Sequence, residues 1–438
     1  MNKNCLLFFL IFTFFGFCYA EPGWESLNEA FDVQIWQDDS LWDDNDSKAA
    51  KRLNLKEESR TLWNNDKKED SKNLSPLLKR LMPEEKFFIS EESSFRRYPS
   101  KQDLILGARA YSFALYAKDG KAACISIVFA NKGDIKELFS GSGVNWRNYN
   151  KIIIEDGKKL REKLVSVLGK SKTDKFGQGK AVGEAVERWN WNGHSILLSI
   201  QENEYVALRI VPAEVADAMG KPDKISDIKL REILEKRVKR RKNGDVIITG
   251  IPMVNQGEKG YCVPATWERY LRYVGIPADM YVLAMAGDTG VTGGTSVDVM
   301  AKGAEQLVRK NRRSIKQVSF YSIKAHKFSK YIDKGLPVMW SMFSEEERNY
   351  EITRRSKKRL TVSDWDKWIE KLEPVRKSAK RMIIDKFKDG HVCLIIGYNK
   401  KTKEIAISDS YGPEYAERWI TEEEADAISR NDFRIIKW

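Results

Sequence analysis

The sequence predicts an α+β protein made of two separate α+β units joined by a basic segment. Three observations lead to this prediction. Strand-like runs between residues 108–130 and 185–211 are separated by turn signals and by one helical pattern. Six of the seven residues at 236–242 are basic. From residue 246 onward, helical patterns come first and strand-like runs follow.

Length and composition set the broad class. The 438 residues are enough for two or three domains with a sizeable core. Hydrophobic residues make up 42% and charged residues 32%, which indicates a globular chain rather than a disordered one. The formal net charge is +13, but the basic run contains no interleaved aromatic residues. This disfavours nucleic-acid binding.

The first twenty residues differ in kind from the rest. Lys3 is followed by an apolar run from Cys5 to Phe17 and then by Cys18-Tyr19-Ala20, which is the pattern of a cleaved secretory signal. The alternative is a membrane anchor, but the run is short for a membrane span. We therefore expect residues 1–20 to be a signal peptide and the mature protein to be secreted, periplasmic or otherwise extracytoplasmic. We expect no membrane span after its removal.

Three cysteines remain once the signal is removed: Cys124, Cys262 and Cys393. Three cysteines in a secreted chain are not a disulfide framework, so at least one is a free thiol unless two molecules pair. Cys124 lies in a strand-like run and is interpreted as a small core residue. A Cys–His metal site is disfavoured because too few further ligands exist, and no cofactor is expected.

Residues 21–75 are interpreted as an acidic, Trp-containing extension. Residues 21–46 carry nine acidic side chains and no basic one, with Trp24, Trp36 and Trp42 interleaved. Few aliphatic residues and no sustained period favour a poorly ordered or surface-wrapping segment. The alternative is an acidic arm that docks on the basic remainder of the chain. In that case the N-terminal region would act as an intramolecular inhibitory pro-segment.

Residues 76–225 are expected to form an N-terminal α+β domain. Helical spacing predicts a short helix at Leu77–Met82 and a long one at Ile152–Leu168, before Gly169. No catalytic constellation is found here, and His194 is expected to be a surface turn residue. Strands are expected at Ala108–Ala117, Lys121–Ala130, Ala185–Trp191, Ser195–Gln201 and Tyr205–Val211, with turns at Lys118-Asp119-Gly120 and Asn192-Gly193.

A charged helical pattern from Asp227 to Lys242 predicts a basic helical linker over residues 226–245, and the C-terminal domain then covers residues 246–438. The charged stretch Ser344–Lys388 contains a helix start at residues 363–366. Further helices are expected from Cys262 and at Asp279–Met285, Val297–Arg309, Lys327–Asp333 and Thr421–Ser429. Strands are expected at Pro337–Phe343, Gly390–Tyr398, Glu404–Ser410 and Phe433–Trp438.

The sequence around Cys262 combines a loop, a thiol and the start of a helix. Trp267 and Leu271 recur at helical spacing, and Pro264 suits a first helical turn because its missing N–H has no partner there. Cys262 therefore lies at a predicted helix N-terminus, where the positive end of the helix dipole favours a thiolate. Gln256 can return its amide toward the same point and donate to an oxyanion.

The sequence contains only three histidines that could act as a general base for this thiol. His391 lies near the start of a predicted strand, where alternation places it on the same face as Cys393. If Tyr398 faces Glu404 across the next turn, then Cys393 faces Asp409. His391 and Asp409 then share a face, one diagonal step apart, so that the carboxylate can orient the imidazole. A slip of one residue would separate them. Cys393 itself is interpreted as a core residue.

These residues resemble the papain-like cysteine peptidases. The resemblance rests on Gln-Gly-x-x-Gly-x-Cys at 256–262, a Gly-His strand start at 390–391 and Asp409 after the next strand. The separation of 129 residues between cysteine and histidine is also similar. Tyr-Cys-Val-Pro-Ala-Thr around the cysteine, and aspartate where papain has asparagine, resemble the bacterial branch that trims double-glycine leaders from bacteriocins. The resemblance covers about residues 246–438.

The resemblance implies a papain-like C-terminal domain in which the nucleophile helix packs on an antiparallel sheet. It implies that Cys262 is the nucleophile, His391 the base, Asp409 the residue that orients it, and Gln256 the oxyanion donor. The implied partner is a peptide or protein substrate. One departure is Lys259, which stands where papain has a disulfide-forming cysteine.

The sequence therefore predicts a secreted thiol hydrolase that cleaves peptide or isopeptide bonds through a thioester on Cys262. Two alternatives stay open. The same site could serve an amidase or acyltransferase acting on cell-wall peptides, because an amine can capture the thioester as water does. The domain could also be a catalytically inactive binding module of the same fold. Products formed with an added amine distinguish the first alternative, and an unreactive Cys262 would indicate the second.

Overall fold

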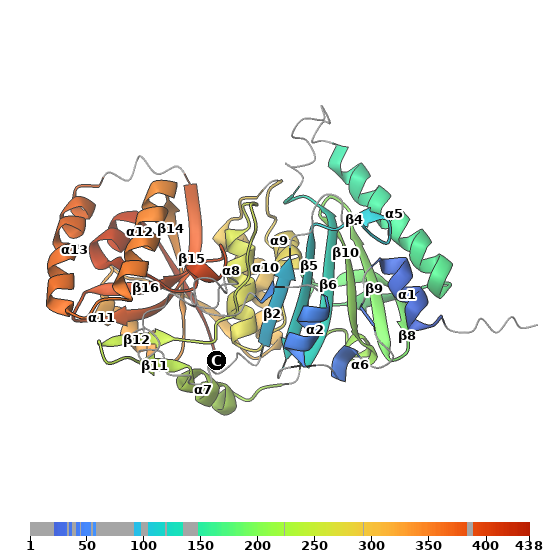
Figure 1. Cartoon of the computed structure of the whole chain (residues 1–438), viewed down its shortest axis with the longest axis horizontal. Coiled ribbons are helices and arrows are strands. Elements are labelled where there is room, and N and C mark those ends of the chain that lie inside the picture. The colour runs from blue at the N-terminus through green and yellow to red at the C-terminus, as the bar shows by residue number, and fades with distance from the viewer. Residues whose placement is uncertain are drawn as a thin grey trace, which may run out of the picture.

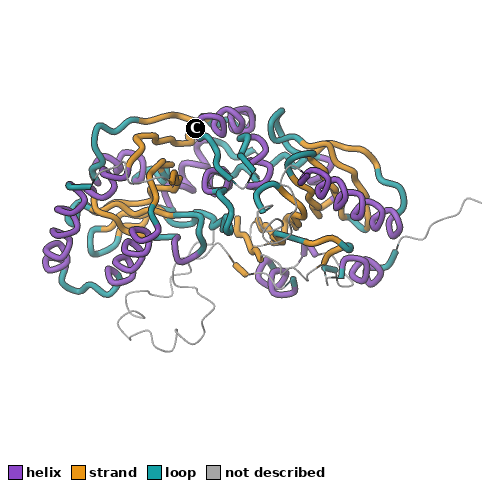
Figure 2. The backbone as a smooth tube through the Cα atoms, turned by 90° about the horizontal axis from the view of Figure 1, so that it is seen from above, coloured by secondary structure: helices purple, strands orange, loops and turns teal. Residues whose placement is uncertain are grey.

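The structure is a computed structural model in which helices combine with antiparallel sheets, an α+β arrangement. The expected signal peptide at residues 1–20 and the helix expected at Leu77–Met82 lie outside the described residues. Two large sheets lie side by side along the long axis of the molecule (Figure 1 and Figure 2). The described residues are 22–32, 35–36, 41–43, 45–53, 56–57, 92–97, 104–118, 121–134, 148–222, 224–291, 293–382 and 389–438.

The N-terminal sheet has the strand order β1-β2-β5-β6-β10-β9-β8-β7, and every neighbouring pair is antiparallel. Asn192 and Gly193 turn between β8 and β9 with φ of 41° and 74°, as a tight hairpin requires. The strands expected between residues 121 and 211 are confirmed, whereas the strand expected at Ala108–Ala117 is divided into β4 and β5. The bounds are β1 Lys56–Glu57, β2 Glu92–Arg97, β5 Ser112–Lys118, β6 Lys121–Asn131, β7 Lys172–Phe176, β8 Glu184–Trp191, β9 His194–Gln201 and β10 Tyr205–Pro212, with a separate pair, β3 Leu104–Ile105 and β4 Ala108–Arg109.

Helices cover one face of this sheet. The long helix α5 (Tyr149–Leu168) packs on β6, β9 and β10, and α1 (Trp24–Phe31) packs on α5. A short 3₁₀ turn, η1 (Leu41–Asp43), and helix α2 (Asp46–Arg52) lie against β6. The acidic segment thus contributes buried apolar side chains to the core beneath the sheet. Its acidic composition did not indicate this role. Its fully buried members include Leu27, Phe31, Ile35 and Trp36.

His194 corrects one sequence expectation. It was expected at the surface because it follows the Asn192-Gly193 turn, yet it is only 1% exposed. The rings of Trp36, Trp42 and Trp191 surround it, with centroids 5.3–5.9 Å from its own. Burial lowers the pKa of His194 below its ordinary value, which favours the neutral ring. Trp36 and Trp42 of the acidic segment, together with the neighbouring Trp191, bury this histidine.

The other face of the N-terminal sheet packs against the C-terminal half. Val128 of β6 and Tyr205 and Ala207 of β10 belong to the same hydrophobic core as residues of helices α8 (Cys262–Tyr273) and α9 (Met280–Ala286). Asp279, the N-cap of α9, accepts hydrogen bonds from Tyr116 and Ser126 of the sheet. Figure 1 shows α8, α9 and α10 (Val297–Lys310) between the two sheets. The two halves therefore share one core.

The connecting segment differs from the helix expected over Asp227–Lys242. After a short helix α6 (Ala213–Asp217), helix α7 runs only from Asp227 to Lys236. Val238–Arg240 instead forms strand β11, which pairs with β12 (Asp245–Ile248) around an Asn243-Gly244 turn. The Asn-Gly hairpin signal, together with pairing across the turn, prevails over the helical spacing of the basic run.

The C-terminal sheet has the order β11-β12-β15-β14-β18-β13, and β16 pairs with β15 and β17. Helix α8 packs on β15, α12 packs on β17, and α13 packs on α14. Among the described helices, none combines the length and apolar character that a membrane span needs. The remaining bounds are β13 Ser314–Val318, α11 Ala325–Ile332, β14 Val338–Ser344, α12 Glu346–Arg359, α13 Trp365–Lys380, β15 Asp389–Asn399, β16 Glu404–Ser408, η5 Pro413–Tyr415, β17 Arg418–Thr421, α14 Glu422–Ile428 and β18 Ser429–Lys437.

Candidate active site

The thiol of Cys262 lies at the first residue of α8, as the sequence predicted. Every residue of α8 from Val263 to Tyr273 is buried, so the helix is held firmly between the two sheets. Thr266, one turn into the helix, donates a hydrogen bond to the carbonyl of Val392 at 3.0 Å. This bond ties the start of α8 to β15 next to His391. Cys262 itself is partly exposed.

His391 and Asp409 lie in direct contact. The Nε2–H of His391 donates to Oδ1 of Asp409 at 2.7 Å, with both side chains at most 3% exposed. This bond fixes the orientation of the imidazole and leaves Nδ1 as the ring nitrogen available to the Cys262 sulfur. The structure thus brings together the histidine and the carboxylate that the sequence placed on one strand face.

Near the turn, the pairing of β15 with β16 differs from the register that the sequence predicted. The sequence paired Tyr398 with Glu404, whereas Tyr398 pairs with Ile405. A β-bulge then inserts one extra residue into β15, so that Leu394 pairs with Ser408. The bulge compensates for the one-residue error at the turn. The alignment beyond it is the one that the sequence analysis expected.

Charges in this group shift the pKa values in a consistent pattern. Burial alone would raise the pKa of the Cys262 thiol, but the hydrogen bond with His391 and its positive charge lower it overall. Burial opposes a charged imidazole, yet the bonds to Asp409 and Cys262 raise the pKa of His391 to about 9. A depressed thiol pKa beside a raised imidazole pKa favours the thiolate–imidazolium pair.

Tyr411 covers the imidazole. Its ring stacks on that of His391, with centroids 4.8 Å apart and planes within 10°. Its hydroxyl lies 3.1 Å from Nδ1. Tyr411 therefore covers one face of the imidazole, with its hydroxyl within hydrogen-bond distance of Nδ1.

Gln256 is buried and bound at both ends of its amide. Its Nε2 donates to the carbonyl of Lys259 at 2.9 Å, and its Oε1 accepts from Ser410 Oγ at 2.7 Å. Its backbone N–H donates to the Ser410 carbonyl at 2.8 Å. An amide nitrogen has two hydrogens, so one remains for a substrate oxygen. These bonds connect the loop before Cys262 to the segment that carries Asp409.

Residues 248–435 match the family model described as the Peptidase_C39 like family. This match supports a C39-like cysteine peptidase. It begins in β12 and ends in β18, so this C39-like region contains Cys262, His391 and Asp409. The N-terminal sheet lies outside it. No curated protein matches the chain.

Two residues of the C39-like region near the site escaped the sequence analysis. Tyr411 lies two positions after Asp409, and an aromatic residue so close to the carboxylate was a usable signal. Arg418 gave no such signal, because it lies in the short strand β17, which was not predicted. Its Nη2 donates to Oδ2 of Asp409 at 2.5 Å, and both side chains are fully buried. Burial would raise the pKa of Asp409, but Arg418 and His391 hold it well below its usual range.

Helix α12 provides hydrogen-bond acceptors for the Arg418 guanidinium. Asn349 and Thr353 both accept hydrogen bonds from its Nη1. Helices α12 and α13 belong to the charged stretch Ser344–Lys388. In the structure its described helices pack on β17 and α14, and the stretch reaches the site through Arg418. In the part of the chain that is described, no group of three or more His, Cys, Asp or Glu side chains could hold a metal ion.

Substitution of Arg418 by methionine is expected to lower the free energy of unfolding by about 3–5 kcal/mol, because it leaves the buried Asp409 carboxylate without its main cation. Urea denaturation followed by tryptophan fluorescence measures this loss. Arg354→Met is the matched control, since Arg354 pairs with Glu351 on the solvent side of α12. Equal stability changes in the two variants would contradict a stabilising role for the Arg418–Asp409 pair.

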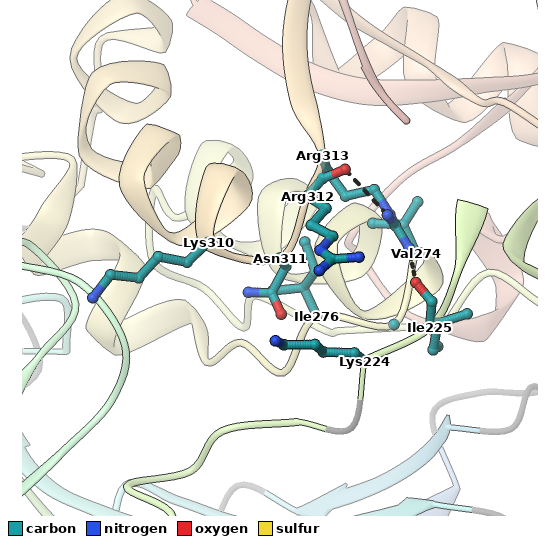
Figure 3. Close-up of a pocket in the computed structure, with 9 residues that line it drawn as sticks. Lys224, Ile225, Val274, Ile276, Lys310, Asn311, Arg312 and Arg313 are labelled. Atoms are coloured by element: carbon teal, nitrogen blue, oxygen red, sulfur yellow. Dashed lines mark hydrogen bonds between the residues drawn. The ribbon is translucent and has the colours of Figure 1, made fainter.

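A separate pocket of about 20 Å³ lies at the opposite end of α8 (Figure 3). Cys262 begins this 12-residue helix and Val274 caps its C-terminus, which places the two ends about 18 Å apart. The Arg313 guanidinium in the pocket donates to Asp227 and to the carbonyl of Ile225. This pocket is therefore distinct from the candidate active site. It is lined by Lys224, Ile225, Val274, Gly275, Ile276, Lys310, Asn311, Arg312 and Arg313.

Proposed function

We propose that this protein is a thiol hydrolase that cleaves peptide or isopeptide bonds, with Cys262 as nucleophile, His391 as general base and acid, and Asp409 as the residue that orients His391. The observation that carries the proposal is the bond of His391 to Asp409 at 2.7 Å, next to Cys262 at the start of α8, whose thiol pKa His391 lowers. The C39-like match over residues 248–435 supports it independently.

The proposed reaction has two stages. The Cys262 thiolate attacks the carbonyl carbon, and the resulting oxyanion accepts hydrogen bonds from the Cys262 backbone N–H and Gln256 Nε2. When the C–N bond breaks, the imidazolium of His391 gives its proton to the leaving amine and a thioester remains. His391 then takes a proton from water as the water attacks the thioester. Breaking the C–S bond releases the acid product and restores the thiolate–imidazolium pair.

We also propose a papain-like architecture for residues 246–438, because a nucleophile helix packs on an antiparallel sheet that carries the histidine. Within that group, the sequence around Cys262 and the use of Asp409 favour the branch that processes bacteriocin leaders. The N-terminal pattern of residues 1–20 supports export, so the proposed place of action is extracytoplasmic. The proposed substrate is a peptide or protein.

The pH dependence of alkylation and hydrolysis tests the proposed pair. Iodoacetamide is expected to label Cys262 rapidly at pH values well below about 8.5, the pKa of a free thiol. Labelling should slow only in acid, when the thiolate is protonated. Hydrolysis should fall both in acid and above about pH 9, where His391 loses the proton that the leaving amine needs. Mass spectrometry of the labelled peptides and kcat/KM across pH measure the two profiles.

The chain supplies internal controls for this experiment. Burial raises the pKa of Cys124 to about 12 and that of Cys393 well above its ordinary value, so neither should label at neutral pH. In His391→Ala, the profile of Cys262 should revert to that of an ordinary thiol. Slow labelling of Cys262 in the unsubstituted chain, with no difference from His391→Ala, would refute the activated pair.

A further inference from the structure

We propose that Asp134, in the turn after β6 of the N-terminal sheet, is a positioning residue for the active site. It would hold the loop at residues 256–261 through an ion pair with Lys259, so that Gln256 points at the oxyanion. This inference rests on the proposed hydrolase function and adds a role for the N-terminal half, which lies outside the C39-like region.

The ion pair joins the two halves of the protein. Nζ of Lys259 lies 2.9 Å from Oδ1 of Asp134, and the side chains are 1% and 17% exposed. The Lys259 ammonium also lies near the rings of Tyr261 and Tyr281, 5.9 Å and 5.5 Å from their centroids. A buried ammonium is costly unless it is paired, so the lysine strongly favours the position in which Asp134 can reach it.

The backbone of Lys259 connects this pair to the proposed oxyanion donor. Its carbonyl accepts two hydrogen bonds, from Gln256 Nε2 at 2.9 Å and from the N–H of Tyr261 at 2.8 Å. Cys262 follows directly. A displacement of Lys259 therefore moves the group that orients the Gln256 amide. It need not move the thiol, because Thr266 ties α8 to β15.

Asp134 is itself held rigidly. The side-chain oxygen of Asn131 accepts from the N–H groups of Gly133 and Asp134 at 3.1 and 3.0 Å, which folds the end of β6 into a tight turn. Gly133 lies against Tyr261, and a side chain at this position would meet the tyrosine ring at 2.6 Å. The sheet thus presents the carboxylate from a fixed turn that packs closely on the residue before the nucleophile.

Alkylation and hydrolysis respond differently to such a role. Hydrolysis passes through an oxyanion and depends on Gln256, whereas alkylation by iodoacetamide forms none and depends only on the Cys262–His391 pair. Asp134→Asn is therefore expected to lower kcat by about 10- to 100-fold, with KM and the pH profile of Cys262 alkylation unchanged. Gln256→Ala should show the same pattern, and adding Asp134→Asn to it should cause no further loss.

Two further variants separate positioning from general destabilisation. Asp134→Glu keeps the carboxylate and should recover part of kcat. Glu187→Gln removes another acid of the same sheet, one that pairs with Arg161 away from the loop, and should leave kcat unchanged. Hydrolysis rates are divided by the amount of Cys262 that iodoacetamide labels at neutral pH. An unfolded fraction of the protein therefore does not lower the kcat that is obtained.

The outcomes are distinct. Loss of kcat with intact alkylation supports the inference. Unchanged kcat in Asp134→Asn overturns it, as does an equal loss of alkylation and hydrolysis, or a further loss when the substitution is combined with Gln256→Ala. Slow alkylation of Cys262 in the unsubstituted chain would instead overturn the proposed function, and this inference with it.

Discussion

Replacing Cys262 by alanine is expected to lower kcat for peptide hydrolysis by about 10⁴-fold or more, since removal of a nucleophile disables a catalytic group that acts as a unit. No other described side chain lies at the helix N-terminus beside His391 and can form the thioester. The fold should survive, because α8 is anchored by buried residues such as Trp267 and Leu271 beyond its first turn. Product formation on a fluorogenic peptide, with circular dichroism of the variant, measures both expectations.

Cys393→Ala is the matched control for this substitution. Cys393 is also a thiol within the C39-like region, but it is fully buried in β15 and packs in the core. Its loss should reduce stability slightly and leave the chemistry intact. Hydrolysis that persists in Cys262→Ala at the rate of the unsubstituted chain would refute the thiol mechanism. A binding module would instead be indicated if the unsubstituted chain bound peptides without cleaving them.

The site could be predicted largely from the sequence because its parts have local signals. The proposed nucleophile begins a helix with an early proline, the histidine lies on β15, and the carboxylate directly follows the next strand, β16. Their shared strand face depended on a register that was wrong at Tyr398 and was restored by a bulge in β15. A bulge is not visible in hydrophobic alternation and could not be predicted. The predicted register was right near His391 and Asp409 because the error at the turn and the bulge cancel.

Other features depend on contacts between segments far apart in the chain. Arg418 is found only when β17 pairs with β16 and brings its guanidinium to Asp409. His194 is buried because Trp36 and Trp42 of the acidic segment join Trp191 in covering it. The ion pair of Lys259 with Asp134 spans 125 positions of sequence and joins two units that were expected to be separate. Composition and periodicity describe one segment at a time and do not register such contacts.

Removal of the N-terminal half is expected to destabilise the C39-like region rather than to release activity. A chain of residues 226–438 keeps α7 and β11 but loses Val128, Tyr205 and Ala207 from the shared core. Burial of each large apolar side chain contributes about 1.5–3 kcal/mol, and the exposed faces of α8 and α9 would favour aggregation. Size-exclusion chromatography, thermal unfolding and hydrolysis per labelled Cys262 measure the effect.

A chain that begins at Glu21 is the control, because it removes only the expected signal peptide. The opposite result is equally informative. If residues 226–438 form a cooperative monomer that hydrolyses substrate faster than the longer chain, the N-terminal region acts as the inhibitory pro-segment that the sequence suggested. The contacts of Lys259 and Tyr261 with the turn at residues 131–134 argue for a supporting role instead. They hold the loop next to the proposed nucleophile, so we expect loss of the N-terminal half to lower hydrolysis.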